Sequence, residues 1–415
     1  MNMYPPTPIQ LDPQALSLRW LFIDMNSYFA SCEQQARPEL RGKPIAIVPM
    51  EAETTCAIAA SYEAKAFGIK TGTLIREAKA MCPKLILVPA RPRLYVTYHH
   101  RFVEAIEQCI PVEDVLSVDE VACRLDRTQQ TPEAIRILAQ RIKTVMHEQM
   151  GACLTCSIGA ASNKLLAKLA SDMQKPDGLV ILEPSAMPTP ILHLKPSDIC
   201  GIGRNMSLRL AERGIQTMPE LWALDSTHLR QIWGGVTGAR FHALLHGADL
   251  PSPVRPRRSM GHQHVLSPEQ RTLLLATPVI RQLLTKLALR LREESFYARR
   301  LILDIKWMGA LGHFVEEARF HETQETQRLM KTLTTLWSRA PTGLKPLRIG
   351  VTLADLVPIT KHQYDLFEKP ANAALTQALD HINEKYGRDT IAFGNVGETI
   401  KSKISFHRVP SLAET

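Results

Sequence analysis

The sequence lacks the features that mark membrane and secreted proteins. No run of about 18 consecutive apolar residues, the length that a transmembrane helix needs, occurs in its 415 residues. The first segment, MNMYPPTPIQLDPQ, contains prolines and has neither the basic start nor the apolar run of a signal peptide. We therefore expect no membrane partner, and we interpret residues 1–18 as a flexible leader.

Cysteines are few and irregularly spaced. Of the eight, Cys153 and Cys156 form the one close pair, in GACLTCSIGA. No second pair and no Cys/His partner stands at zinc-finger spacing, so buried thiols in a strand are favoured over half of a zinc site. Because the pattern does not predict a disulfide framework, a reducing cytoplasm is the expected location.

Acidic residues are outnumbered by basic ones. The formal net charge is +9 and the pI about 9.1. This favours a polyanionic partner, nucleic acid first, but a merely basic enzyme remains open. Residues 251–310 hold 11 Lys and Arg against 4 Asp and Glu, whereas residues 360–415 hold 7 of each. The excess lies in one segment, which favours a binding surface over uniform solubility charge.

The first half of the chain alternates strands with helices. The apolar segments WLFID, KPIAIVP and LTCSIGAAS predict strands, the first ending at Asp24, and VEDVLSVDEVACRL predicts a strand hairpin. Helices are expected to begin after Asn26 or Ser27 and at Ser162. An amphipathic helix is predicted over residues 132–150, with these apolar positions: Ile135, Ile137, Leu138, Ile142 and Val145. The alternation indicates an α/β or α+β fold.

The rest of the chain changes character twice. From about Pro184 it is mostly helical with glycine punctuation, up to a Pro- and Arg-rich linker, PSPVRPRR, at residues 251–258. A further domain runs to about Pro358, with a long helix in TPVIRQLLTKLALRLREE and strands in RRLILDIKW and LRIGVTLADL. The residues beyond it form a tail with no obvious core of its own.

Three acidic residues stand where predicted strands end or turn. Asp24 ends the first strand, and Asp119 and Glu120 are adjacent in the hairpin. Phosphoryl transfer by two divalent metal ions needs oxygen ligands of this kind, and Mg²⁺ keeps several waters, so few carboxylates suffice. Acidic pairs at strand turns are more often solvated, however. The pattern alone therefore leaves metal binding as the less favoured interpretation.

Five motifs reverse that balance. LFIDMNSYFASCE, SYEAKAFGIKTG, LSVDEV, SIGAASNKLLAKLASDMQKPDG and ICGIGRNMSLRLAERGI stand in the order and spacing of Y-family DNA polymerases, which the chain resembles over residues 19–360. The resemblance implies low-fidelity, template-directed DNA synthesis across damaged templates. It also implies an α+β multidomain, right-hand fold with these parts: palm 19–27 and 94–184, small fingers 28–93, helical thumb 185–250, linker 251–258, α/β little finger 259–358, and C-terminal tail 359–415.

The resemblance assigns roles to the acidic residues and to one aromatic residue. Asp24, Asp119 and Glu120, with the backbone carbonyl of Met25, match the ligands of two Mg²⁺ ions. Phe29 matches the steric gate, whose ring lies against the sugar C2′ and excludes a ribose 2′-hydroxyl. A lone Phe would otherwise be interpreted as core packing.

Three further residues match positions that contact the incoming deoxynucleoside triphosphate: Tyr62, Lys65 and Lys175. Two positions depart from the family pattern. Many relatives carry Arg where Lys65 stands and a hydroxyl residue where Ala59 stands. Because Lys is a point charge and not a bidentate fork, we expect a looser grip on the triphosphate.

Two segments match DNA-binding surfaces for the primer–template. CGIGRNMSLRLAERG resembles a helix-hairpin-helix, in which Gly201 and Gly203 let the backbone approach a phosphate without reading sequence. Arg255, Arg257 and Arg258 match the linker into the little finger, where DNA contact is favoured over solvated charge.

The tail contains a candidate partner motif. QYDLF resembles the peptide that bacterial polymerases dock into the sliding clamp, with Gln363 at its start and Leu366 and Phe367 as apolar anchors. Such pentapeptides also arise by chance.

Two other hypotheses compete with an active polymerase. The first is a non-catalytic Y-family paralogue that serves as a DNA-binding adaptor at the clamp, which is expected to lack the carboxylates present here. The second is a helix-hairpin-helix nuclease or glycosylase, which explains the GIG motif but not the first half.

Overall fold

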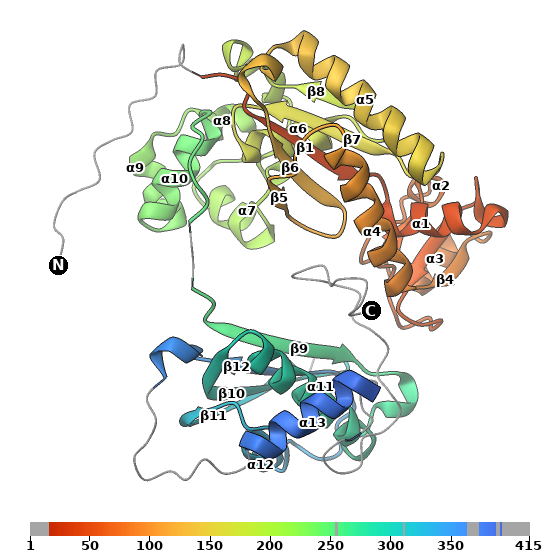
Figure 1. Cartoon of the computed structure of the whole chain (residues 1–415), viewed down its shortest axis with the longest axis vertical. Coiled ribbons are helices and arrows are strands. Elements are labelled where there is room, and N and C mark those ends of the chain that lie inside the picture. The colour runs from red at the N-terminus through yellow and green to blue at the C-terminus, as the bar shows by residue number, and fades with distance from the viewer. Residues whose placement is uncertain (1–15, 254–255, 310–311, 363–372, 387–390, 392–415) are drawn as a thin grey trace. The chain divides into compact units, whose positions relative to one another are not determined.

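The computed structural model of the chain describes residues 16–253, 256–309, 312–362, 373–386 and 391 (Figure 1). The chain divides between Ser252 and Pro253 into two compact units. The division lies inside the expected linker at residues 251–258. Among the described residues, no helix is long and apolar enough to cross a membrane.

A five-stranded sheet forms the centre of the first unit, in the order β5-β6-β1-β7-β8 (Figure 1). Its strands are β1 (Trp20–Met25), β5 (Asp114–Val115), β6 (Glu120–Arg124), β7 (Cys156–Ala161) and β8 (Leu179–Ile181). The central strand β1 is buried along its whole length and pairs antiparallel with both β6 and β7. The predicted strands and the predicted hairpin are confirmed.

The two faces of β1 serve different cores, because side chains alternate along a strand. Leu21 and Ile23 pack in a core with α4 (Pro92–Glu107) and α5 (Pro132–Met150). Trp20 and Phe22 belong to a second core, which contains α6 (Lys164–Met173). Asp24 follows the same alternation and therefore shares the α6 side of the sheet.

Helix α5 spans the predicted residues, but one predicted apolar position is wrong. Ile135, Leu138 and Ile142 are buried, whereas Ile137 is 73% exposed. Each helical residue advances about 100°, so Ile137 lies about 200° from Ile135 and cannot share its face.

Helix α6 packs unusually close to β7. A Cβ on Gly159 would meet Ala167 O at 2.1 Å and Ser171 N at 2.3 Å. The N-cap of α6 is Asn163 and not the expected Ser162. Its Oδ1 accepts from the backbone N–H of Leu166, while its Nδ2 donates to carbonyls of the helical segment that follows the sheet.

A small subdomain lies between β1 and α4 in sequence. It contains a three-stranded sheet and short helices: α1 (Tyr28–Ala36), β2 (Ile45–Val48), β3 (Ala59–Ala60), α2 (Tyr62–Lys65), α3 (Ile75–Met81) and β4 (Ile86–Pro89). Ser27 precedes α1 in a left-handed conformation, φ 46°, without a side-chain cap. Asn26 does not cap the helix either. Its amide instead binds Ser157 and the backbone N–H of Asp177.

The rest of the first unit is helical, as predicted. Its helices are α7 (Arg204–Ala211), α8 (Met218–Trp222), α9 (Ser226–Trp233) and α10 (Val236–Leu245). Their buried residues, such as Leu210, Leu229 and Leu245, belong to the same core as Trp20 and Phe22. This segment is therefore packed directly on the α6 side of the sheet.

The second unit has a four-stranded sheet in the order β11-β10-β12-β9. Its elements are β9 (Ser259–Val265), α11 (Leu273–Glu293), β10 (Phe296–Trp307), β11 (His313–Thr323), α12 (Thr326–Trp337), β12 (Pro346–Ala354), β13 (Val357–Pro358) and α13 (Ala373–Tyr386). Helices α11 and α12 share one apolar core with the sheet.

The tail after Pro358 contributes one described helix, which the sequence did not predict. Asp380 of α13 accepts two bonds from the Arg292 guanidinium, at 2.6 and 2.7 Å. This bidentate pair ties α13 to α11 of the second unit. The expected clamp motif, residues 363–367, lies outside the described residues.

Gly159→Ala tests the close approach of α6 to the sheet. We expect the first unit to lose about 3 kcal/mol of stability, because the added methyl meets backbone atoms that cannot rotate away. The measurement is calorimetric unfolding of the full chain. Gly203→Ala is the matched control. Its φ is −82° and no atom lies within 4 Å of its added Cβ, so its transition should be nearly unchanged. Equal transitions for the two variants would contradict this packing.

Candidate active site

Two carboxylates face each other across neighbouring strands at the end of β1. The register of β1 and β6 places Asp24 directly opposite Glu120. Asp24 is 5% exposed, and Asp119 immediately precedes Glu120. The backbone N–H of Met25 donates to the Asp119 carbonyl at 2.9 Å, which fixes that residue beside the strand end. The three predicted acids therefore lie close together at this strand end.

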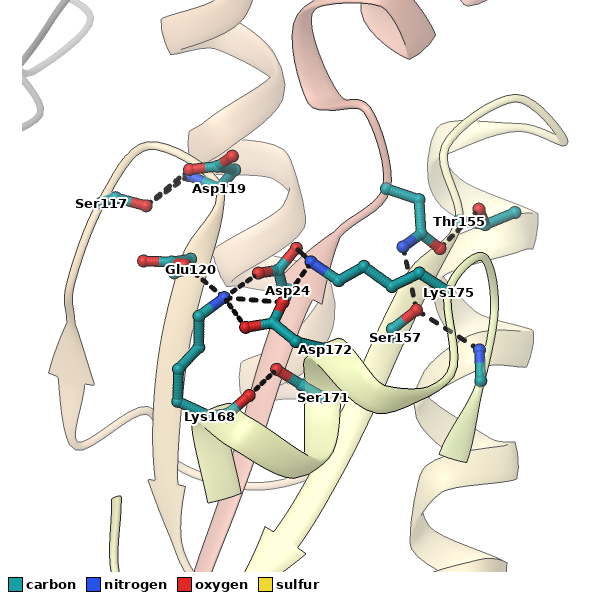
Figure 2. A network of polar contacts seen from close by, with 12 residues as sticks. Asp24, Ser117, Asp119, Glu120, Thr155, Ser157, Lys168, Ser171, Asp172 and Lys175 are labelled. Carbon is teal, nitrogen blue, oxygen red and sulfur yellow. Dashed lines mark hydrogen bonds and ion pairs between the residues drawn. The ribbon is translucent and has the colours of Figure 1, made fainter. Parts of the chain in front are cut away.

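Two lysines form ion pairs with these carboxylates (Figure 2). Lys168 Nζ, from α6, contacts Asp24 Oδ2 and lies 2.7 Å from Glu120 Oε1 and 3.2 Å from Asp172 Oδ2. Lys175 Nζ, from the loop after α6, lies 2.7 Å from Asp24 Oδ1 and 2.8 Å from Asp172 Oδ1. Each oxygen of Asp24 thus has its own ammonium group.

The pKa shifts report the same crowding of charge. Burial raises the pKa of Asp119, and the neighbouring charges of Asp24 and Glu120 raise it further, against the hydrogen bond from Ser117. Burial alone would lower the pKa of Lys168, but its contacts with Asp24 and Glu120 outweigh burial and raise it. This cluster of carboxylates stabilises a nearby cation, as the ligands of a metal ion also do.

The carboxylates are not drawn around a single point. Ser117 Oγ donates to Asp119 Oδ1 at 2.5 Å, so this carboxylate is turned to its own loop (Figure 2). In the described part of the chain, no three His, Cys, Asp or Glu side chains are arranged to hold a metal ion directly. The donor set nevertheless fits Mg²⁺, because all three groups supply the oxygen ligands it prefers and together carry charge that needs a cation.

The predicted steric-gate residue is supported by an aromatic stack. The ring of Phe29 stacks on Tyr95, with centroids 4.4 Å apart and 17° between the planes. Tyr95 Oη donates to Glu33 Oε1 at 3.0 Å, and the fully buried Glu33 also accepts from Arg91. Tyr28 packs in the core and donates to the Tyr95 carbonyl at 2.6 Å. The orientation of the Phe29 ring is therefore set by contacts that reach α4.

The residues expected to contact the triphosphate lie near the carboxylates. Lys65 Nζ lies 4.5 Å from the centre of the Tyr62 ring. Burial, followed by the charge of Lys175, lowers the pKa of Lys65. Burial raises the pKa of Tyr62, against the charge of Lys175 and contacts with Ser27 and Asn26 that lower it. The Tyr62 hydroxyl therefore lies beside the side chains of Ser27 and Asn26.

The expected DNA-binding residues lie in different parts of the chain. Gly201 has φ 95°, which favours glycine, and Gly203 begins α7. Arg257, in the second unit, forms an ion pair with Glu294, which partly offsets its charge. The backbone carbonyl of Arg258 accepts from Leu356. Arg255 lies outside the described residues.

Sequence reasoning missed Lys168, Asp172, Glu33 and Tyr95. Lys168 and Asp172 are four residues apart on α6, which is the spacing of an ordinary surface ion pair. No signal in the sequence shows that Lys168 reaches strands β1 and β6, because that contact depends on the packing of α6. Of the Cys153–Cys156 pair, which was expected to be buried, Cys156 is buried in β7 and Cys153 is half-buried.

Known proteins resemble this chain in sequence. The impB/mucB/samB family matches residues 23–172, and the C-terminal domain of that family matches residues 257–366. DNA polymerase IV of Moorella thermoacetica is 33% identical over 387 residues, which cover 89% of this chain and 94% of that protein. DNA polymerase IV of Pelotomaculum thermopropionicum is 31% identical over 379 residues, covering 89% and 93%.

Solved structures share the fold. A Y-family DNA polymerase chimera of Dbh and Dpo4 has a TM-score of 0.68 at 24% identity, covering 82% of this chain and 99% of that one. An insertion ternary complex of Dbh DNA polymerase has a TM-score of 0.54 at 24% identity, with the same coverage. The α+β fold is thus that of the Y-family DNA polymerases. The chain belongs to the impB/mucB/samB family, as a relative of the DNA polymerase IV proteins.

Proposed function

We propose that this chain is a DNA-directed DNA polymerase that adds deoxynucleotides to a primer 3′ end in translesion synthesis, with the end of β1 as its active site. Relatives named DNA polymerase IV align with about nine-tenths of the chain, which supports the activity. The observation that carries the placement of the site is the pairing of Asp24 with Glu120 beside Asp119. The partners are primer–template DNA and deoxynucleoside triphosphates.

Asp24, Asp119 and Glu120, with the Met25 carbonyl, would hold two Mg²⁺ ions. When bound, such ions stabilise the charge that develops on the attacking and leaving oxygens during nucleotidyl transfer. Lys175 is already beside Asp24, and its ammonium group can bind a phosphate oxygen of the incoming nucleotide.

Phe29 and the triphosphate-binding residues complete the nucleotide site. The ring of Phe29, fixed against Tyr95, excludes a sugar that carries a 2′-hydroxyl. Tyr62 offers its hydroxyl, and Lys65 a cation, to the triphosphate. With Lys65 in place of Arg and Ala59 in place of a hydroxyl residue, we propose that this grip is weaker than in relatives that carry those groups.

DNA and the clamp are bound outside this centre. The backbone at Gly201 and Gly203 meets a DNA phosphate, and Arg255, Arg257 and Arg258 add charge at the linker. The QYDLF segment, Gln363 to Phe367, docks into the bacterial sliding clamp. The eight cysteines are unpaired thiols, which is compatible with the reducing cytoplasm as the place of this activity.

The adaptor hypothesis is not favoured. A DNA-binding paralogue without catalysis has no need for carboxylates gathered at a strand end, since acidic groups repel one another and the DNA phosphates. Asp24, Asp119 and Glu120 are all present and grouped together.

Asp119→Ala should abolish primer extension. We expect kcat for nucleotide addition with Mg²⁺ to fall by roughly a thousandfold, because the variant loses one metal ligand. Binding of primer–template, measured by fluorescence anisotropy, should persist. A purified wild type that binds primer–template but adds no nucleotide with any divalent metal would favour the adaptor instead.

Phe29→Ala should weaken the discrimination against ribonucleotides. The ratio of kcat/KM for a deoxynucleotide to that for the matching ribonucleotide should fall by roughly tenfold or more, because the clash with the 2′-hydroxyl is removed. Tyr28→Phe is a control, since Tyr28 is buried beside Phe29 and turned into the core. An unchanged sugar preference in Phe29→Ala would remove Phe29 from the role of gate.

Deleting residues 363–367 should abolish stimulation by the sliding clamp. Basal extension without clamp should stay within about twofold of wild type, because none of the proposed metal-binding, nucleotide-binding or DNA-binding residues lies in the segment. Leu366→Ala with Phe367→Ala is the smaller variant with the same expected result. Full clamp stimulation of either protein would show that the motif arose by chance.

A further inference from the structure

Lys168 contacts more of the acidic side chains in the site than Lys175, a lysine that the family resemblance suggested. Its Nζ contacts carboxylates from three elements: Asp24 of β1, Glu120 of β6 and Asp172 of its own helix. Its side chain is 14% exposed, and Nζ lies 5.2 Å from the centre of the Phe22 ring. The ammonium group therefore lies largely buried between α6 and the central sheet of the first unit.

The two lysines of the site differ in how they are anchored. Lys168 lies in the middle of α6, whose backbone is packed against β7 at Gly159 and capped by Asn163. Lys175 lies in the loop after α6, and its side chain is 28% exposed. Lys168 contacts both Asp24 and Glu120, whereas Lys175 forms its ion pairs with Asp24 and Asp172. Lys168 is thus the cation placed between the two facing strands.

The pairing of β1 with β6 creates the need for such a cation. Like charges directly opposite each other on neighbouring strands repel, and burial strengthens the repulsion. Asp24 and Glu120 stand in this relation. A metal ion bound by the same oxygens would satisfy them equally well, so Lys168 and a metal ion compete for one place.

Asp172 gives Lys168 a second partner. It lies four residues later on α6, one helical turn away, and is already 3.2 Å from Nζ. When a metal ion takes the oxygens of Asp24 and Glu120, the ammonium group can keep this ion pair without moving its backbone. Helix α6 therefore carries both Lys168 and Asp172, the carboxylate with which Lys168 can remain paired.

We propose that Lys168 is a built-in counter-cation that holds Asp24 and Glu120 together in the metal-free enzyme and is displaced toward Asp172 when metal binds. Lys168 is a positioning residue in this role and does not touch the reacting atoms. Its positive charge keeps the empty site folded and weakens metal binding, so that metal is bound firmly only when a nucleotide brings further negative charge. The inference rests on the proposed metal-binding role of these carboxylates.

Lys168→Met tests the competition with a readout other than activity. Mn²⁺ binding to the DNA-free protein is followed by the electron paramagnetic resonance signal of the free ion, and unfolding is followed with EDTA or with Mn²⁺. Without the competing charge, we expect the Mn²⁺ midpoint to fall on the order of tenfold. The melting temperature should drop in EDTA and be largely restored by Mn²⁺.

Lys164→Met is the matched control. Lys164 lies one turn earlier on α6, forms an ion pair with Asp114 and lies 4.2 Å from the centre of the Trp20 ring. It touches none of the proposed metal ligands, so its Mn²⁺ midpoint should equal that of wild type. Lys168→Arg keeps the charge and should also leave the midpoint within about threefold of wild type.

A Mn²⁺ midpoint of Lys168→Met that is equal to or higher than that of wild type would overturn the inference. A Lys168→Met protein that folds with Mn²⁺ but not in EDTA would support it. A wild type that binds no Mn²⁺ at this site would instead refute the proposed metal ligands, which separates the two failures.

A measurement on the wild type covers the case in which Lys168→Met does not fold at all. Lysine is labelled with carbon-13 at the ε-carbon, and the Lys168 signal is assigned with Lys168→Arg. On titration with Mg²⁺ this signal should shift at the metal-binding midpoint, while that of Lys164 stays in place. A Lys168 signal that ignores Mg²⁺ while the protein binds it would overturn the inference.

Discussion

The repulsion between Asp24 and Glu120 is the constraint around which the first unit is built. The antiparallel register of β1 and β6 places these carboxylates opposite each other, and the burial of Asp24 limits how far water can screen them. A pair of this kind is stable only beside positive charge. The fold supplies that charge from α6 and from the loop after it. A site for divalent metal ions requires the same arrangement of carboxylates. The stability of the sheet and its proposed chemistry therefore both depend on how the repulsion between Asp24 and Glu120 is neutralised.

The packing of α6 against the sheet places the positive charge of Lys168 beside these carboxylates. Gly159 lets the helix approach β7 to backbone contact, and Asn163 fixes where the helix begins. Asn163 also binds the carbonyls of Leu244 and Ala248, so the helical segment after the sheet is tied to the same point. A shift of α6 by one residue would turn Lys168 away from the sheet by about 100°. The close packing at Gly159 and the N-cap at Asn163 thus determine where the charge of Lys168 lies.

The opposite side of the strand end carries the proposed steric gate. Phe29 follows β1 closely, but its ring is fixed by Tyr95 of α4, which in turn depends on the buried ion pairs of Glu33. Metal ligation and sugar selection are therefore proposed to start from one strand and to be stabilised by different helices. The second unit shows a third pattern, because several of its arginines are already paired with acids. Arg257 with Glu294 and Arg292 with Asp380 are examples. Its basic excess is smaller in effect than the count of charges suggests.

The sequence by itself determined the order of the elements and the position of the chemistry along the chain. Strand and helix periodicity predicted β1, the hairpin, α5, α11 and the linker, because side-chain alternation depends on local backbone geometry. The five motifs identified the family and named Asp24, Asp119, Glu120 and Phe29. Local patterns failed where partners are distant, at the N-cap of α6 and at α13 in the tail. The prediction for Ile137 was wrong for a different reason, because helical spacing alone excludes it from the face of Ile135. Tertiary structure alone decided that Asp24 faces Glu120, that Lys168 lies between them and that Tyr95 supports Phe29. These contacts join residues 48 to 144 positions apart. Which of such distant residues meet is set by how strands register and helices pack, which no local pattern encodes.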